Sequence, residues 1–171
     1  MTNHTELTPL SPVGSPLTIT SMTTPAEALA FRSLNEEWIA DLFTIEDSDR
    51  RVLEDPFGSI VQPGGDVLIG RDGDGAIVGC VALVPAADGS FEVSKMTIAP
   101  AARNRGAGRA LLQATITRAR QLAVERLFLG SSTKLANAVH LYESAGFVHV
   151  PADRIALAPY ARADVFMEML L

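Results

Sequence analysis

Residue types suited to holding a phosphate gather in one short segment, Arg103-Asn104-Arg105-Gly106-Ala107-Gly108-Arg109. The two glycines lack a Cβ, so the main chain there can turn tightly and bring its N–H groups close to a ligand. A helix starting at this point would add unpaired N–H groups and the positive end of its dipole. Two glycines ahead of a helix are a weak indication alone, so the flanking elements must decide whether this is an anion site.

Those flanking elements have the order strand, glycine turn, helix. Phe91 to Ile98 is predicted to be a strand that ends at Ala99-Pro100. From Gly106 to about Val124, apolar residues at helical spacing predict a helix that covers one face of a sheet. Because a phosphate-binding turn requires this order, we expect an anion at the start of the helix.

The remaining elements are predicted to belong to a single domain of residues 17–171, preceded by a disordered tail of residues 1–16. In the first helix, the apolar stripe is expected at Ala30, Leu34, Trp38 and Leu42, with Phe31 beside them. The other expected strands are Leu17 to Thr20, Val67 to Ile69, Ala76 to Val84, Leu127 to Leu129, Phe147 to Val148 and Val165 to Leu171, and the other expected helices are Ala26 to Phe43, Glu46 to Leu53 and Asn137 to Ala145.

Composition limits the classes of function. The chain has 171 residues and a formal net charge of -6, which argues against a nucleic-acid partner and makes the arginine-rich loop a local basic feature on an acidic protein. No apolar run is long enough to span a membrane and no secretory signal is seen, so we expect a cytoplasmic protein. The single cysteine, Cys80, excludes an internal disulfide, leaves no zinc pattern and is expected to be buried.

Three separated blocks resemble one family, the GCN5-related N-acetyltransferases (GNAT). Arg103-x-x-Gly106-x-Gly108 matches the family's acetyl-CoA signature, Gln/Arg-x-x-Gly-x-Gly/Ala, and Phe91 to Ile98 stands where its central strand precedes that loop. Ala138-x-x-Leu141-Tyr142-x-x-x-Gly146-Phe147 resembles the second motif of the family. Residues 31–39 and 160–167 further resemble a bacterial subgroup of small stand-alone members.

The resemblance implies an α/β fold with a mixed six- to seven-stranded sheet flanked by helices. The strands Phe91–Ile98 and Leu127–Gly130 would splay apart and leave a cleft for the co-substrate, acetyl-CoA; no metal is implied. The family's asparagine contact to the co-substrate is not expected, because Leu135 occupies that position. The resemblance places the pyrophosphate on the backbone of Arg103, Asn104, Arg105, Gly106, Ala107, Gly108 and Arg109, with each arginine either a phosphate contact or merely solvated, and the pantetheine amides on the backbone of Met96, Thr97 and Ile98.

Glu92 is the candidate general base, similar in position to the glutamate of some family members. Proton transfer from a lysine-like ammonium to an ordinary glutamate is uphill by about 8 kcal/mol. A catalytic glutamate therefore needs a raised pKa, a water chain or an amine that is a weaker base. Strand alternation predicts that Glu92 shares a face with Ser94, Met96 and Ile98. The alternative is a structural salt bridge with Arg154 or Arg162.

Tyr142 is the second candidate catalytic residue, since the matching tyrosine of the family hydrogen-bonds the departing sulfur. Full proton transfer from a phenol to a thiolate is uphill by about 2 kcal/mol, so stabilisation of the thiolate is the safer role. A tyrosine packed in the core with its hydroxyl at the rim is the alternative.

Acceptor-binding residues are expected in regions that shape the acceptor pocket in the family. Tyr160 and Glu37 lie there, and Arg162 could hold a substrate carboxylate by paired hydrogen bonds. Trp38 and Phe43 lie there too, but they also fit an ordinary core stripe.

The sequence thus predicts an N-acetyltransferase that moves an acetyl group from acetyl-CoA to a primary amine of a small molecule or amino acid. Direct attack in a ternary complex is expected, because no cysteine is placed to form an acyl-enzyme. A non-catalytic acyl-CoA-binding or regulatory domain is the alternative, whereas a P-loop hydrolase is excluded because no Gly-Lys-Ser/Thr follows the glycines. The acceptor, the acyl chain length and the oligomeric state stay open, although homodimers are common in the family.

Overall fold

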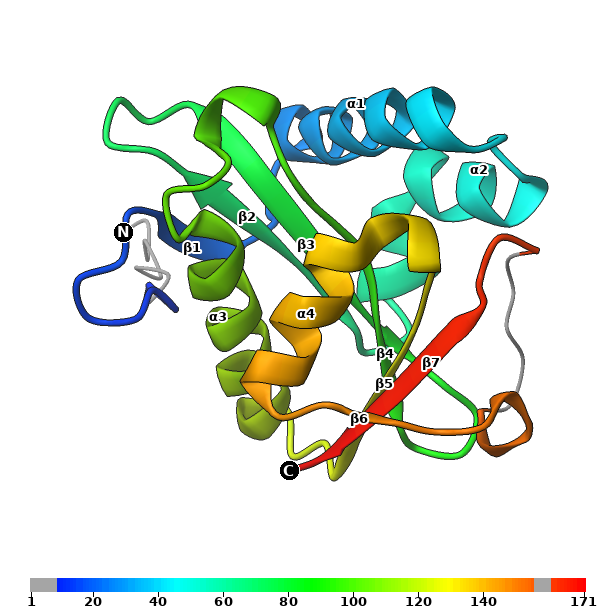
Figure 1. Ribbon diagram of the computed structural model, residues 1–171. Coiled ribbons are helices and arrows are strands. Elements are labelled where there is room, and N and C mark those ends of the chain that lie inside the picture. Colours follow the sequence, from blue (N-terminus) through cyan, green and yellow to red (C-terminus); the bar gives the residue numbers. More distant parts are fainter. Residues whose placement is uncertain (1–8, 156–160) are drawn as a thin grey trace.

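A mixed sheet forms the centre of the protein, with helices on both faces (Figure 1). The computed structural model describes residues 9–155 and 161–171. Within these residues the sheet has seven strands in the order β1-β2-β3-β4-β5-β7-β6, and β4 pairs with β5 in parallel. The strands are β1 (Thr18–Ser21), β2 (Asp66–Arg71), β3 (Ile77–Pro85), β4 (Phe91–Ile98), β5 (Arg126–Ser131), β6 (Val148–His149) and β7 (Val165–Leu170).

Helices α3 (Ala107–Gln121) and α4 (Ala136–Ala145) cover one face, and α1 (Pro25–Leu42) and α2 (Asp47–Glu54) cover the other (Figure 1). A π-helical turn, Phe57–Val61, follows α2 and was not expected from the sequence. Short 3-10 turns span Pro100–Ala102, Thr133–Leu135 and Ala152–Arg154. The described helices include none long and apolar enough to cross a membrane. The predicted fold class is confirmed.

Helix α1 buries a different stripe from the one predicted. Its start is fixed by a capping box, in which Thr24 Oγ1 accepts from the N–H of Glu27 at 3.2 Å and the Glu27 carboxylate accepts from the N–H of Thr24 at 3.1 Å. The predicted stripe was displaced by one residue except at Phe31, which is fully buried, and Leu42 is 50% exposed. The buried positions of the helix are Glu27, Phe31, Asn35 and Ile39.

Polar residues can occupy this stripe because each has partners. Glu27 pairs with Arg71 of β2 at 2.8 Å. The Asn35 side chain donates to the carbonyl of Phe31 at 2.9 Å and accepts from Trp38 Nε1 at 3.0 Å. The spacing of apolar residues cannot predict such positions, because a polar side chain is buried only where the folded structure supplies its hydrogen-bond partners.

A bulge interrupts β4 at Lys95. The ladder between β3 and β4 shifts between Cys80 and Ala82, so that Lys95 and Met96 both lie opposite one residue of β3. Lys95 has a φ of +55°, in the left-handed region. The extra residue reverses the alternation of side chains along the rest of the strand.

The reversal separates residues that simple alternation had placed together. Glu92 lies opposite Val84 and, with Ser94, faces α1 and α2. Met96 and Ile98 instead pack against the core under α3. The prediction that all four share one face was therefore wrong, because the bulge lies between them.

The two central strands splay apart, as expected. Parallel pairing joins β4 to β5 only at Phe91 with Leu127 and at Glu92 with Phe128. Beyond this point, the rest of β4 and β5 form no ladder pair with each other in the part of the chain that the structure describes.

Part of the expected tail contacts the domain. The N–H of Leu10 donates to the carbonyl of Ile19 at 2.9 Å, and Leu10 packs against the core. The division at residue 16 stays a prediction.

Candidate active site

The arginine–glycine loop has the geometry of an anion site. Gly106 is the N-cap of α3 with a φ of +78°, and Asn104 has a φ of +62°. Among the described residues no side chain caps α3, so the N–H groups of its first turn have no side-chain acceptor. The side chains of Arg105 and Arg109 are exposed beside this turn. The loop can therefore offer backbone donors and positive charge to a phosphate.

The two glycines serve different purposes. Gly106 needs its left-handed conformation, although a Cβ there would meet open space. At Gly108 a Cβ would lie 3.3 Å from Leu141 Cδ2 of α4, so this glycine allows α4 to pack closely against the start of α3. Arg103 ties the loop to the sheet, because its Nε donates to the carbonyl of Ile98 at 2.9 Å.

The backbone expected to hold the pantetheine arm lies in the splayed part of β4. Thr97 and Ile98 are paired with β3 along one edge. Among the described residues, their other edge has no strand partner, because β5 has separated from β4. A strand edge without a strand partner can receive an extended chain as an added strand, although the Ile98 carbonyl here already accepts from Arg103. The role of Met96, Thr97 and Ile98 in co-substrate binding stays a prediction.

Tyr142 lies on α4, on the α3 side of the sheet. Its ring contacts the ring of Phe147 edge-on, with centroids 5.9 Å apart. Burial raises the pKa of Tyr142 to about 12. The hydroxyl therefore keeps its proton far above neutral pH, which is the state that can donate a hydrogen bond to a thiolate.

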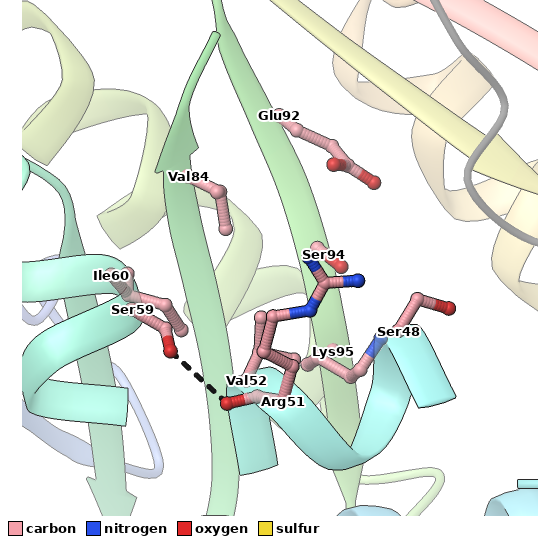
Figure 2. Close-up of a pocket in the computed structure, with 9 residues that line it drawn as sticks. All are labelled: Ser48, Arg51, Val52, Ser59, Ile60, Val84, Glu92, Ser94 and Lys95. Carbon is pink, nitrogen blue, oxygen red and sulfur yellow. Dashed lines mark hydrogen bonds between the residues drawn. The ribbon is translucent and has the colours of Figure 1, made fainter. Parts of the chain in front are cut away.

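Glu92 lines a hollow of about 350 Å³ on the opposite face of the sheet (Figure 2). Burial raises the pKa of Glu92, and the nearby charge of Lys95 opposes this only in part. Within residues 9–155 and 161–171, the Glu92 side chain has no hydrogen bond or ion pair. The hollow is lined by Ser48, Arg51 and Val52 of α2, Ser59 and Ile60 of the π-helical turn, Val84 of β3, and Glu92, Ser94 and Lys95 of β4.

The alternative role for Glu92, a structural salt bridge with Arg154 or Arg162, is not found among the described residues. Arg154 pairs with Glu168 at 3.3 Å instead. Arg162 pairs with Asp49 at 2.7 Å and with Glu46 at 3.3 Å. Glu92 is therefore left facing the hollow.

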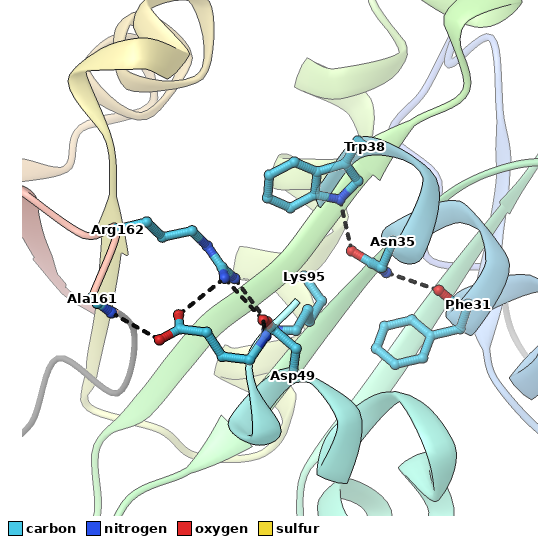
Figure 3. A network of polar contacts seen from close by, with 8 residues as sticks. Phe31, Asn35, Trp38, Asp49, Lys95, Ala161 and Arg162 are labelled. Atoms are coloured by element: carbon cyan, nitrogen blue, oxygen red, sulfur yellow. Dashed lines mark hydrogen bonds and ion pairs between the residues drawn. The ribbon is translucent and has the colours of Figure 1, made fainter. Parts of the chain in front are cut away.

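An ion network around the buried Asp49 connects residues beside the hollow to the segment before β7 (Figure 3). The carboxylate of Asp49 accepts two hydrogen bonds from Arg162, at 2.9 and 2.7 Å, and pairs with Lys95 Nζ at 3.0 Å. Burial by itself would raise the pKa of Asp49, but the hydrogen bond from Arg162, the backbone N–H of Glu46 and the charge of Lys95 together lower it to about 2. The network joins α2 to β4 and to the segment before β7.

Sequence reasoning missed Asp49 and Lys95. The helix that contains Asp49 is strongly charged, which is typical of a solvated surface. One signal was available: Asp49 is four residues before the buried Leu53 and so lies on the same helical face. The burial of Lys95 depends on the bulge, and no sequence pattern indicated that bulge.

Among the described residues, those expected to bind the acceptor do not line this hollow. Glu37 is exposed on α1. Trp38 packs edge-on against Phe43 with ring centroids 6.3 Å apart, and the Arg162 guanidinium lies 5.6 Å from the Phe43 centroid. Tyr160 lies outside the described residues. Their role in acceptor binding stays a prediction, whereas the structure adds Arg51 and three serines to the lining of the hollow.

Cys80 is fully buried, as expected, and burial raises the pKa of its thiol to about 12. It is therefore a poor nucleophile. The described residues contain no group of three or more histidines, cysteines and carboxylates that could hold a metal ion.

The chain belongs to the acetyltransferase (GNAT) family, whose sequence profile matches residues 30–147. A relative in Schizosaccharomyces pombe, an uncharacterized N-acetyltransferase called C1271.07c, is 28% identical over 137 residues, which are 78% of this chain and 83% of that protein. The family resemblance seen in the sequence is confirmed.

Solved structures show the same fold. An acetyltransferase of the GNAT family from Staphylococcus aureus Mu50 has a TM-score of 0.82 at 18% identity and covers 91% of this chain and 99% of its own. The yncA protein from Salmonella typhimurium, solved with its cofactor acetyl-CoA, has a TM-score of 0.69 at 22% identity and covers 92% of this chain and 95% of its own.

Proposed function

We propose that this protein transfers an acetyl group from acetyl-CoA to the primary amine of a small molecule or amino acid, by direct attack in a ternary complex. The observation that carries the proposal is the position of Glu92. This carboxylate lies at the point where β4 and β5 separate, has a raised pKa, and makes no hydrogen bond or close ion pair with a described side chain. A raised pKa brings a carboxylate closer to the proton affinity that a general base needs.

The chain's residues fit acetyl-CoA on the α3 side of the sheet. The start of α3 without a side-chain cap, reached through a left-handed glycine, suits a pyrophosphate. The unpaired edge of β4 suits the pantetheine amides. Acetyl-CoA supplies the thioester carbonyl that an amine attacks.

In the proposed reaction, Glu92 accepts a proton from the acceptor amine as the new C–N bond forms. A main-chain N–H near Met96 to Ile98 polarises the carbonyl and stabilises the oxyanion. The C–S bond then breaks, and the Tyr142 hydroxyl donates a hydrogen bond to the departing sulfur. The raised pKa of Tyr142 keeps that hydroxyl protonated.

Release of free thiol from acetyl-CoA, measured over a broad panel of primary amines, tests this proposal. We expect turnover with at least one small amine. Saturable binding of acetyl-CoA without turnover on any amine would instead favour the acyl-CoA-binding or regulatory domain.

A further inference from the structure

A second charged residue faces the same hollow as Glu92. Arg51 of α2 lines it, and Figure 2 shows the guanidinium directed toward β4, beside Ser94. The Arg51 side chain makes no hydrogen bond or ion pair with any other described residue; only its backbone carbonyl has a partner, Ser59 Oγ at 3.0 Å. Its neighbour Arg50 differs, since it pairs with Asp47 at 2.9 Å and does not line the hollow.

The other charges at this site are already paired. Asp49 and Glu46 carry two negative charges, and Lys95 and Arg162 carry two positive charges, within one network (Figure 3). Arg162 donates twice to Asp49 and once to Glu46, so its guanidinium is largely occupied. Arg51 and Glu92 therefore remain as one positive and one negative group, both directed at a single cavity and not paired with each other.

We propose that the acceptor is an amino-carboxylate, such as an α-amino acid, whose amine lies at Glu92 and whose carboxylate lies at Arg51. This inference rests on the proposed acetyl transfer. An arginine guanidinium binds a carboxylate with two parallel hydrogen bonds, so Arg51 would fix the orientation of the acceptor as well as its charge. Glu92 would then receive the amine in the position from which it can take the proton.

The remaining walls of the hollow limit the acceptor's side chain. Val52, Ile60 and Val84 form an apolar part of the lining. A cavity of about 350 Å³ is at the small end of ligand sites. The fit is to a single amino acid with a small aliphatic side chain, and the hydroxyl of Ser94 is placed to hydrogen-bond its polar groups.

A matched series of acceptors tests the proposal on the full-length protein: valine, valinamide and isobutylamine, each assayed over a pH series so that rates refer to the neutral amine. We expect kcat/KM for valine to exceed that for the two uncharged analogues by on the order of tenfold to a hundredfold, because they lack the carboxylate that binds the arginine. Equal kcat/KM for all three acceptors would overturn the assignment while leaving acetyl transfer intact.

Arg51→Gln should raise KM for valine and abolish the preference for valine over isobutylamine. Arg50→Gln is the control, because it removes a neighbouring positive charge outside the hollow and should keep the preference. An equal loss on all acceptors in Arg51→Gln would assign Arg51 a structural role and overturn the proposal.

Calorimetric titration of valine into the protein saturated with coenzyme A separates the two hypotheses. Valine binding that is lost in Arg51→Gln supports the carboxylate site even if no amine is turned over, in which case only the proposed activity fails. No valine binding to the wild-type complex, together with turnover of simple amines, overturns the carboxylate site alone.

Discussion

Glu92 on β4 lies opposite Phe128 on β5 in the last ladder step before the two strands separate. The Glu92 side chain faces α1 and α2, whereas Tyr142 packs on the side of α3 and α4. The opening between the strands thus has a candidate base on one side and a candidate hydrogen-bond donor on the other. This arrangement would allow an amine to approach from the Glu92 side while the sulfur departs toward Tyr142.

Gly108→Glu should weaken acetyl-CoA binding on the order of tenfold or more. Its Cβ would press on Leu141 at 3.3 Å, and its carboxylate would repel the pyrophosphate at the start of α3. Calorimetric titration of acetyl-CoA measures the effect. Gly73→Glu is the control, since a Cβ at Gly73 meets open space in the β2–β3 turn. Wild-type affinity in Gly108→Glu would show that the loop does not bind the co-substrate.

Tyr142→Phe should lower kcat on the order of tenfold while the dissociation constant of acetyl-CoA changes little, because the lost hydrogen bond forms only as the sulfur departs. The pKa of about 12 also predicts that the tyrosine causes no loss of rate between pH 7 and about pH 10. Stopped-flow or steady-state assays across that range measure both effects. An unchanged kcat would show that the role of Tyr142 in the core is purely structural.

Glu92→Gln should slow the reaction most near neutral pH and recover rate under basic conditions. With no base, the reaction depends on amine that has already lost its proton, and this fraction grows with pH. The pH profile of kcat/KM measures the effect. The control is Glu125→Gln, at an exposed glutamate that does not line the hollow. A small and uniform effect at every pH would indicate that water or the substrate accepts the proton.

The same substitution should stabilise the fold above the ordinary pKa of a glutamate. The folded-state pKa of Glu92 is raised by burial, so folding favours the protonated form. The contribution of Glu92 to folding stability is complete below the pKa that it has in the unfolded chain. That contribution is lost as the pH rises through the pKa that Glu92 has in the folded protein. Urea unfolding at pH 4 and pH 8 should show Glu92→Gln gaining stability relative to wild type only at the higher pH. Equal differences at both values would contradict the raised pKa.

Asp49→Asn should destabilise the protein by about 3 to 5 kcal/mol, because it leaves Lys95 and Arg162 without their shared carboxylate. Asp47→Asn, at an exposed position on the same helix, should leave stability nearly unchanged. The lowered pKa of Asp49, about 2 against 3.8, means that its contribution is complete above pH 3.8 and is lost as the pH falls toward 2. Denaturant unfolding measures both effects, and a stable Asp49→Asn variant would show that the network adds little.

The sequence predicted those parts of the protein that are encoded by contiguous residues. The strand, the loop and α3, which form the candidate anion site, follow one another directly along the chain, and Gly146 ends α4 in the left-handed conformation that a C-cap glycine favours. The splay of β4 and β5 followed from the family resemblance and is confirmed by their short pairing.

The parts that could not be predicted depend on contacts between distant residues. Asn35 in α1 is buried against Cys80 of β3, to whose sulfur its side chain donates at 3.4 Å. The bulge at Lys95 is stabilised by an ion pair with Asp49 of another element. Neither contact leaves a periodic pattern in the sequence, so the buried stripe of α1 and the neighbours of Glu92 were both wrongly assigned.

The Asp49–Arg162 contact has a consequence for the order in which the protein assembles. Its two residues are 113 positions apart, whereas β4, the glycine loop and α3 form an uninterrupted stretch. Contacts between residues close in sequence form faster than those that must close a long loop. The stretch from β4 to α3 can therefore take shape early, whereas the ion network that links α2 to the segment before β7 is completed only when the last strand has joined the sheet.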